Sequence, residues 1–175
     1  MQKSGASGTY LAAVAQLCST DALPGNLARC ADLASQAAAA GAQLFALPEC
    51  FAFVGRQMAD KLAVAESFDA PGPILSAVQA MATEHSMWVA AGGFPERSPE
   101  DDHRVYNTFV LCAPSGEVHA LYRKIHLFDI HIPGRAEFRE SASTAPGTEP
   151  VATETPLGTL GLTICYDMRF PELYR

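Results

Sequence analysis

Three residues that could carry out chemistry each follow an apolar run of the kind that forms a strand. Glu49 follows "LFALP", Lys124 follows "VHALYR" and Cys165 follows "LGLTI". A thiol can attack an amide carbonyl, and a carboxylate can take its proton and return it to the leaving amine. An ammonium can stabilise the oxyanion that forms. If the three side chains meet in the fold, they predict amide cleavage by a cysteine nucleophile.

Each of the three also has an ordinary structural interpretation when it is taken alone. A cysteine after a strand is usually a small buried apolar residue. Glu49 would then be a strand-end carboxylate that faces solvent, and Lys124 would belong to a solvated basic edge. The three residues lie far apart in the chain, so spacing alone leaves both interpretations open.

The first part of the chain alternates strand and helix patterns. The apolar runs 11–17 and 44–50 predict strands, and Pro48 ends the second one. Between them, apolar residues recur at helical spacing after Asn26, up to Gly41, which is a residue typical of a helix C-terminus. A strand, a helix and a strand in this order predict a βαβ unit with parallel strands.

Comparable patterns continue to the end of the chain. They predict a helix over 74–86, a strand over 87–94, a hairpin over 106–124, a long loop over 126–150 and a hairpin over 151–164. The fold class expected from this order is α/β, with a mixed sheet covered by helices. In such sheets, sites collect beyond the carboxyl ends of strands, where Glu49, Lys124 and Cys165 are predicted to lie.

The composition excludes several classes of partner. The 175 residues carry a formal net charge of −7 without a Lys/Arg run longer than two residues, so no nucleic acid is expected to bind. No stretch reaches the roughly 18 to 20 apolar residues of a membrane helix, so no membrane is expected either. The first apolar run is too short for a signal peptide and is interrupted by Gln16. Five scattered cysteines without a CxxC pair indicate reduced thiols and a cytoplasmic location.

Two further patterns could point to a metal or a cofactor. His126, Asp129 and His131 are metal-ligating types, but they fall in the predicted 126–150 loop without helical or strand geometry to group them. The segment "GTLGLTIC" contains glycines but matches neither a P-loop nor a dinucleotide-binding fingerprint. We therefore expect neither a metal nor a cofactor.

Three segments carry a resemblance to a known family. "ALPECF", "YRKIHLFDIHIPG" and "ICYDMRFPEL" resemble, in this order, the signature segments of the nitrilase superfamily of carbon–nitrogen hydrolases. "GGFPER" and "VYNTFVL" extend the resemblance to nearly the whole chain from about residue 10 and are most similar to the Nit branch. This branch contains amidases of deaminated glutathione and ω-amidases of α-ketoglutaramate, and the first group is the closer match.

The resemblance implies a role for each matching residue. Glu49 corresponds to the general base, Lys124 to the catalytic lysine and Cys165 to the nucleophile. Glu140, in "EFRES", corresponds to a second glutamate that positions the lysine and the substrate. The backbone N–H of Tyr166 corresponds to a second oxyanion donor. The implied reaction hydrolyses a small carboxylate-bearing amide to an acid and ammonia through a cysteine thioester.

Arg169, four residues past the nucleophile, is a candidate contact for a substrate carboxylate. The alternative for Arg169 is a surface ion pair with a nearby acidic residue. The substrate also stays open at this point: deaminated glutathione is favoured, α-ketoglutaramate is the alternative amide, and a nitrile would make the protein a nitrilase.

The resemblance also implies more chain than the sequence contains. Family domains form a four-layer αββα sandwich, continue well past the nucleophile and commonly pair as homodimers through surfaces near it. We therefore expect a disordered segment over 1–9, a hydrolase domain over 10–175 that is incomplete at its C-terminus, and a helix that begins near Arg169. A homo-oligomer is expected of the full-length protein. A truncated, inactive chain that acts only as a binding or assembly partner is the alternative from another class.

Overall fold

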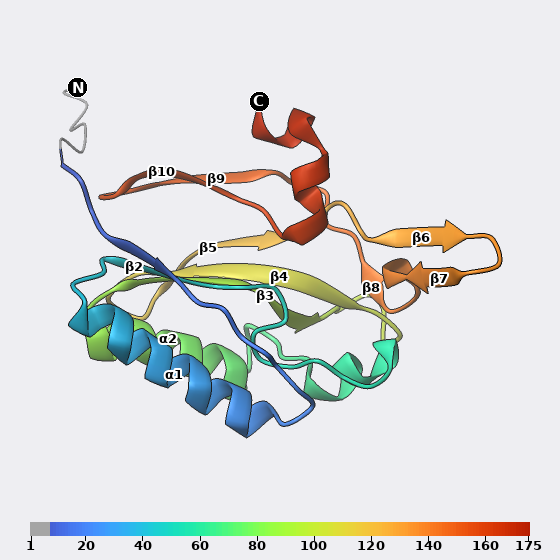
Figure 1. Cartoon of the computed structure of the whole chain (residues 1–175), viewed down its shortest axis with the longest axis horizontal. Coiled ribbons are helices and arrows are strands. Elements are labelled where there is room, and N and C mark those ends of the chain that lie inside the picture. Colours follow the sequence, from blue (N-terminus) through green and yellow to red (C-terminus); the bar gives the residue numbers. More distant parts are fainter. Residues whose placement is uncertain (1–7) are drawn as a thin grey trace.

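The computed structural model describes residues 8–175, so the disorder expected for residues 1–9 lies outside the described residues except at its last two positions. A mixed sheet forms the centre of the molecule (Figure 1). Its strands are ordered β1-β2-β3-β4-β5, and β8 pairs with β4 beyond the end of β5. The strands of this sheet are β1 (Ala12–Val14), β2 (Leu44–Leu47), β3 (Trp88–Arg97), β4 (Val105–Cys112), β5 (Val118–Arg123) and β8 (Thr144–Ala145).

The predicted βαβ unit is confirmed. Strands β1, β2 and β3 pair in parallel, and α1 (Leu23–Ala39) and α2 (Pro73–His85) cover one face of the sheet (Figure 1). Helix α1 buries a stripe of small residues that includes Cys30 and Ala34. Gly41 follows α1 with φ +84, a left-handed conformation that glycine adopts without strain. The first strand is shorter than its apolar run predicted.

Helix α2 begins against a carboxylate from an earlier segment. Buried Glu66 accepts hydrogen bonds from the backbone N–H groups of Gly72, Ile74 and Leu75, at 3.1, 2.6 and 2.9 Å. These N–H groups have no partner within the helix, and the negative charge also suits the positive end of the helix dipole. Glu66 thus fixes the start of α2 from outside the helix.

A second layer covers the opposite face of the sheet. The hairpin that the sequence predicted is formed by β9 (Val151–Thr155) and β10 (Gly158–Leu162). It lies over this face of the sheet (Figure 1). Trp88 and Leu111 of the sheet pack there against Leu157 and Leu160 of the hairpin. Helices, sheet and hairpin are therefore three successive layers, in agreement with the α/β sandwich that was expected.

The prediction of a loop over 126–150 is wrong. Strands β6 (Asp129–Ile132) and β7 (Ala136–Arg139) form a projecting hairpin there, followed by a short 3₁₀ helix over Glu140–Ala142 and then β8. Strand β6 alternates polar and apolar residues over only four positions and is largely exposed, so it lacks the longer pattern that reveals a strand in a sequence.

The prediction of a helix that begins near Arg169 is also wrong in the type of helix and in where it begins. The segment after β10 forms two 3₁₀ helices, Cys165–Arg169 and Pro171–Tyr174. Pro171 separates them because its ring removes a backbone donor and disfavours a helical residue before it. Another 3₁₀ helix, Met58–Val64, follows the end of β2 and borders the pocket described below. Within residues 8–175, no helix has the length and apolar character required to cross a bilayer.

Candidate active site

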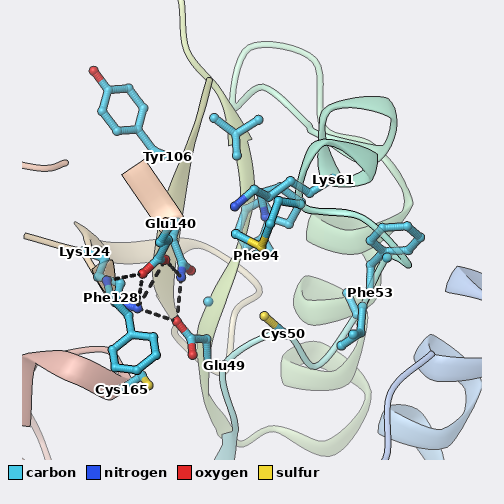
Figure 2. A pocket seen from close by; sticks show the side chains of 18 of the residues that line it. Glu49, Cys50, Phe53, Lys61, Phe94, Tyr106, Lys124, Phe128, Glu140 and Cys165 are labelled. Atoms are coloured by element: carbon cyan, nitrogen blue, oxygen red, sulfur yellow. Dashed lines mark hydrogen bonds and ion pairs between the residues drawn. The ribbon is translucent and has the colours of Figure 1, made fainter. Parts of the chain in front are cut away.

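Lys124 lies at the centre of a buried group of charges. Its Nζ donates to Glu49 Oε1 at 2.8 Å and to Glu140 Oε2 at 2.9 Å, and the Lys124 side chain is only 2% exposed (Figure 2). The structure thus brings together three of the residues that the sequence singled out. The interpretation of Lys124 as a solvated basic residue is wrong.

The ends of separate elements position these charges. Glu49 follows β2, Lys124 follows β5, and Glu140 begins the 3₁₀ helix after β7. The backbone N–H of Lys124 donates to Asn107 O at 2.9 Å, which continues the pairing of β4 with β5. The backbone N–H of Phe128 donates to Glu140 Oε2 at 2.7 Å and orients this carboxylate toward the lysine. Strand ends meet at one edge of the sheet, as the α/β pattern implied.

Asn107 is a member of this group that the sequence did not reveal. Its Nδ2 donates to Glu49 Oε1 at 2.7 Å and lies 3.5 Å from Glu140 Oε1. Asn107 and Lys124 therefore both donate to Oε1 of Glu49 and hold this carboxylate in place. The only signal in the sequence is a polar residue inside the apolar strand "VYNTFVL".

Cys165 lies at the start of the 3₁₀ turn after β10 with φ +47, a left-handed conformation that costs a residue other than glycine energy. Asp167, fully buried, holds this turn: its carboxylate accepts from Ile164 N–H at 2.9 Å and from Tyr122 OH at 2.7 Å. The same carboxylate lies 2.7 Å from His126 Nδ1. Surrounding contacts thus keep the thiol at a sharp bend of the chain.

The charges around Cys165 act on its pKa in opposite directions. Burial raises the pKa of the thiol above its ordinary value, the Glu49 carboxylate beside it raises it further, and the Lys124 ammonium lowers it. Burial by itself would lower the pKa of Lys124, but the hydrogen bonds and charges of Glu49 and Glu140 outweigh it and the pKa is raised. At neutral pH the resting site therefore holds a protonated thiol beside a carboxylate and a charged lysine.

These side chains border one pocket of about 480 Å³, shown in Figure 2. Glu49, Lys124, Glu140 and Cys165 lie along it, and phenylalanine rings supply much of its wall. A second thiol, Cys50, also opens into the pocket, and burial raises its pKa to about 11. A pocket of this size with a few convergent polar groups suits a small organic ligand.

Two predicted residues lie outside the pocket lining. The Tyr166 ring packs edge-on against Phe128, with centroids 4.9 Å apart, and its backbone N–H as an oxyanion donor stays a prediction. Arg169 is exposed, and none of the ion pairs within residues 8–175 includes it. The structure therefore brings Arg169 neither to the pocket nor to an acidic partner.

The candidate metal ligands also have other partners. His126 pairs with Asp167, whereas the Asp129 carboxylate accepts from Ser141 Oγ at 2.6 Å. No group of three or more His, Cys, Asp or Glu side chains in the described part of the chain is arranged to hold a metal ion.

This α/β architecture, with cysteine, glutamate and lysine gathered at strand ends, has the arrangement that the sequence motifs predicted. A family model for carbon-nitrogen hydrolases matches residues 11–175. The chain belongs to the carbon-nitrogen hydrolase family.

Comparison with individual proteins narrows the resemblance. The chain is 44% identical over 166 residues to a mouse protein named deaminated glutathione amidase; the match covers 93% of this chain and 51% of that protein. The Caenorhabditis elegans NitFhit structure superposes with a TM-score of 0.85 at 33% identity, covering 94% of this chain and 40% of that one. Saccharomyces cerevisiae Nit3, described as a member of branch 10 of the nitrilase superfamily, has a TM-score of 0.80 at 28% identity, covering 93% and 57%. The chain spans about half the length of the curated relatives that it matches.

Proposed function

We propose that the protein hydrolyses a small carboxylate-bearing amide to a carboxylic acid and ammonia, or to a carboxylic acid and an amine where the amide nitrogen is substituted. The observation that carries the proposal is the pair of carboxylates on the Lys124 ammonium, at 2.8 and 2.9 Å, in a pocket that also contains Cys165. A structural ion pair would not require a thiol on a strained backbone at its side. The relatives named deaminated glutathione amidase favour that compound or a close analogue as the substrate.

In the proposed mechanism, Glu49 takes the Cys165 proton as the sulfur attacks the amide carbonyl. The Lys124 ammonium and the Tyr166 backbone N–H stabilise the tetrahedral oxyanion. Glu49 then protonates the departing nitrogen, so that ammonia (or the amine of a substituted amide) leaves and a thioester remains on Cys165. Glu49 next removes a proton from water, which attacks the thioester; the carboxylic acid leaves and the thiol is restored. Glu140 and Asn107 act as positioning residues for Lys124 and Glu49.

The direct test is release of ammonia by Cys165→Ala. Because no other group on the protein would form the thioester, turnover should fall by at least about a thousandfold. The side chain removed is small and partly exposed, so the midpoint of thermal unfolding should change little. Ammonia release by Cys165→Ala at the rate of the unsubstituted chain would contradict the assignment of the nucleophile.

A substrate panel separates the rival reactions. Deaminated glutathione, α-ketoglutaramate and a matched nitrile share the thiol chemistry but differ in the leaving group. The first releases the amine of cysteinylglycine and the other two release ammonia, so the carboxylic acid formed is the common readout. Preferential turnover of deaminated glutathione supports the proposal. Preferential turnover of α-ketoglutaramate would indicate an ω-amidase, and preferential turnover of the nitrile would indicate a nitrilase. In the alternative from another class, the chain only binds or assembles with a partner. Cys165 would then show no selective alkylation by iodoacetamide relative to Cys50 in the same pocket.

The proposal includes a cytoplasmic setting and self-association of the full-length protein. All five cysteines are unpaired, which suits a reducing compartment.

Met168 and Tyr174, on the 3₁₀ helices after Cys165, are large side chains that are 67% and 56% exposed. Such exposed apolar surface suits contact with a second copy near the nucleophile. Light scattering coupled to size exclusion would measure the oligomeric state.

A further inference from the structure

A second lysine in the pocket has no counter-ion. Lys61, on the 3₁₀ helix Met58–Val64, lines the pocket, and its Nζ donates to Thr144 Oγ1 at 2.5 Å. No carboxylate within residues 8–175 pairs with it. An ammonium has three donors, so two of them remain for a ligand.

Lys61 differs in this respect from the other two cations that line the pocket. Lys124 is neutralised by Glu49 and Glu140. Arg56 is paired with Asp21 at 2.8 Å, and its side chain is 85% exposed, so water screens its charge. Within the described lining, Lys61 is thus the half-buried positive charge available to an anion.

Burial makes the charged form of Lys61 less stable as long as no anion is bound. Burial lowers the pKa of its ammonium, and the more distant carboxylates of Glu140 and Glu49 only partly offset that effect. The Nζ is nevertheless held in place, because Thr144 is fully buried in β8. A fixed donor that lacks a partner is preorganised to bind an anionic group.

The position of Lys61 relative to Cys165 indicates where a ligand in this pocket carries its charge and its reacting group. Figure 2 shows Lys61 and Cys165 on opposite sides of the pocket, with the nitrogen of Lys61 turned toward its interior. Phe94 and Phe128 contribute apolar wall to the same pocket. A ligand that meets both residues carries an anion and a reacting group at two ends of a short chain.

We propose that Lys61 binds the carboxylate of the substrate and that it, rather than Arg169, makes the enzyme selective for amides that carry a distant negative charge. This inference rests on the proposed function for the identity of the reacting group. It goes further by locating the carboxylate of the substrate at the Thr144-anchored ammonium of Lys61. Lys61 is a binding residue in this proposal and takes no part in proton transfer.

The test measures binding apart from turnover. In a Cys165→Ala background, calorimetry gives the dissociation constants of dicarboxylic monoamides of increasing length and of their methyl esters, which have the same amide but no charge. We expect the monoamide of best-fitting length to bind about 10- to 100-fold more tightly than its ester, the range for a hydrogen bond to a charged group. Adding Lys61→Met, which keeps an apolar stem of similar length, should abolish this preference.

Two further variants serve as controls. Lys61→Arg retains the charge and should retain most of the preference, and Arg29→Met removes a positive charge from exposed surface of α1 and should leave it unchanged. The proposal is overturned if the parent shows no preference for the anion or if Lys61→Met preserves it. If the preference depends on Lys61 but the protein with intact Cys165 releases no ammonia, the proposed function fails and the anion site stands.

Discussion

At the scale of single residues, the two lysines that line the pocket have different partners. Lys124 is paired with two carboxylates, which raise the pKa of its ammonium and fix its position. Lys61 is held by a hydroxyl alone, so its charge is left for a ligand. The Cys165 thiol lies beside the same Glu49 that pairs with Lys124, and its proton can therefore pass to a carboxylate whose own position does not change.

The balance of charges around Cys165 predicts the effect of Glu49→Gln on thiol reactivity. The Glu49 carboxylate raises the pKa of Cys165, so its removal should lower this pKa while Lys124 continues to favour the thiolate. Because the thiolate is the species alkylated, the rise of alkylation with pH should begin at lower pH in Glu49→Gln. Ammonia release should be lost in the same variant, since the general base is gone.

Peptide mass spectrometry of iodoacetamide-treated protein across pH measures this effect at each cysteine. Cys18, an exposed thiol outside the pocket lining, serves as an internal reference. Glu149→Gln, at an exposed position, is the matched control and should not move the profile. A shift of the Cys165 profile to higher pH in Glu49→Gln would contradict the described balance of charges.

At the scale of elements, the turn that carries Cys165 depends on contacts from other strands. Asp167 accepts from Tyr122 at the end of β5 and from the backbone of Ile164 after β10, and His126 stacks on Phe170 with centroids 3.7 Å apart. Burial raises the pKa of Tyr122, and so does its hydrogen bond to Asp167, so this hydroxyl remains a donor. The Asp167 carboxylate therefore links β5 of the sheet to the segment after β10, next to the strained residue Cys165.

Asp167→Asn should lower the free energy of unfolding by about 3 kcal/mol. The carboxylate faces donors on both oxygens, and an amide would turn its own N–H₂ group toward some of them, leaving buried groups unsatisfied. Urea unfolding monitored by Trp88 fluorescence measures the change. Asp32→Asn, on the exposed face of α1, should remain within about 0.5 kcal/mol of the parent. Equal stability of the two variants would contradict this role of Asp167.

At the scale of the whole molecule, the two faces of the sheet are covered to different extents. Two helices bury the larger core on one face, and a single hairpin covers part of the other. Cys165 follows β10 of this hairpin, and Lys124 follows β5, the sheet strand that contacts β9. The shape of the candidate site therefore depends on how firmly the hairpin packs onto the sheet.

Leu160→Ser tests this dependence. Leu160 packs in the cluster that contains Trp88, and its loss should cost about 1 to 2 kcal/mol because it is only partly buried. The Trp88 emission maximum should shift to longer wavelength as water approaches the indole. Thr159→Ser, at the exposed neighbouring position on β10, should change neither quantity. An unchanged emission in Leu160→Ser would mean that the hairpin does not shield the tryptophan.

The sequence by itself determined the elements with strong local signals and the order of the motifs. The helical spacing of apolar residues such as Cys30 and Ala37 predicted α1, and Gly41 marked its end. The runs before Glu49, Lys124 and Cys165 predicted strand ends. These features are local, because helix and strand periodicity and the left-handed preference of glycine act within a few residues.

Only the tertiary structure decided which of these residues meet. Asn107 gave only the signal of a polar residue inside an apolar strand, and Lys61 gave none. Their importance comes from Glu49 and from the pocket, which distant segments form. The hairpin of β6 and β7 escaped prediction because its strands are short and largely exposed. Arg169 lies exposed at the end of the 3₁₀ helix Cys165–Arg169, outside the pocket lining. Contacts between segments far apart in the chain depend on how the layers pack, and the chemistry of this site depends on those contacts.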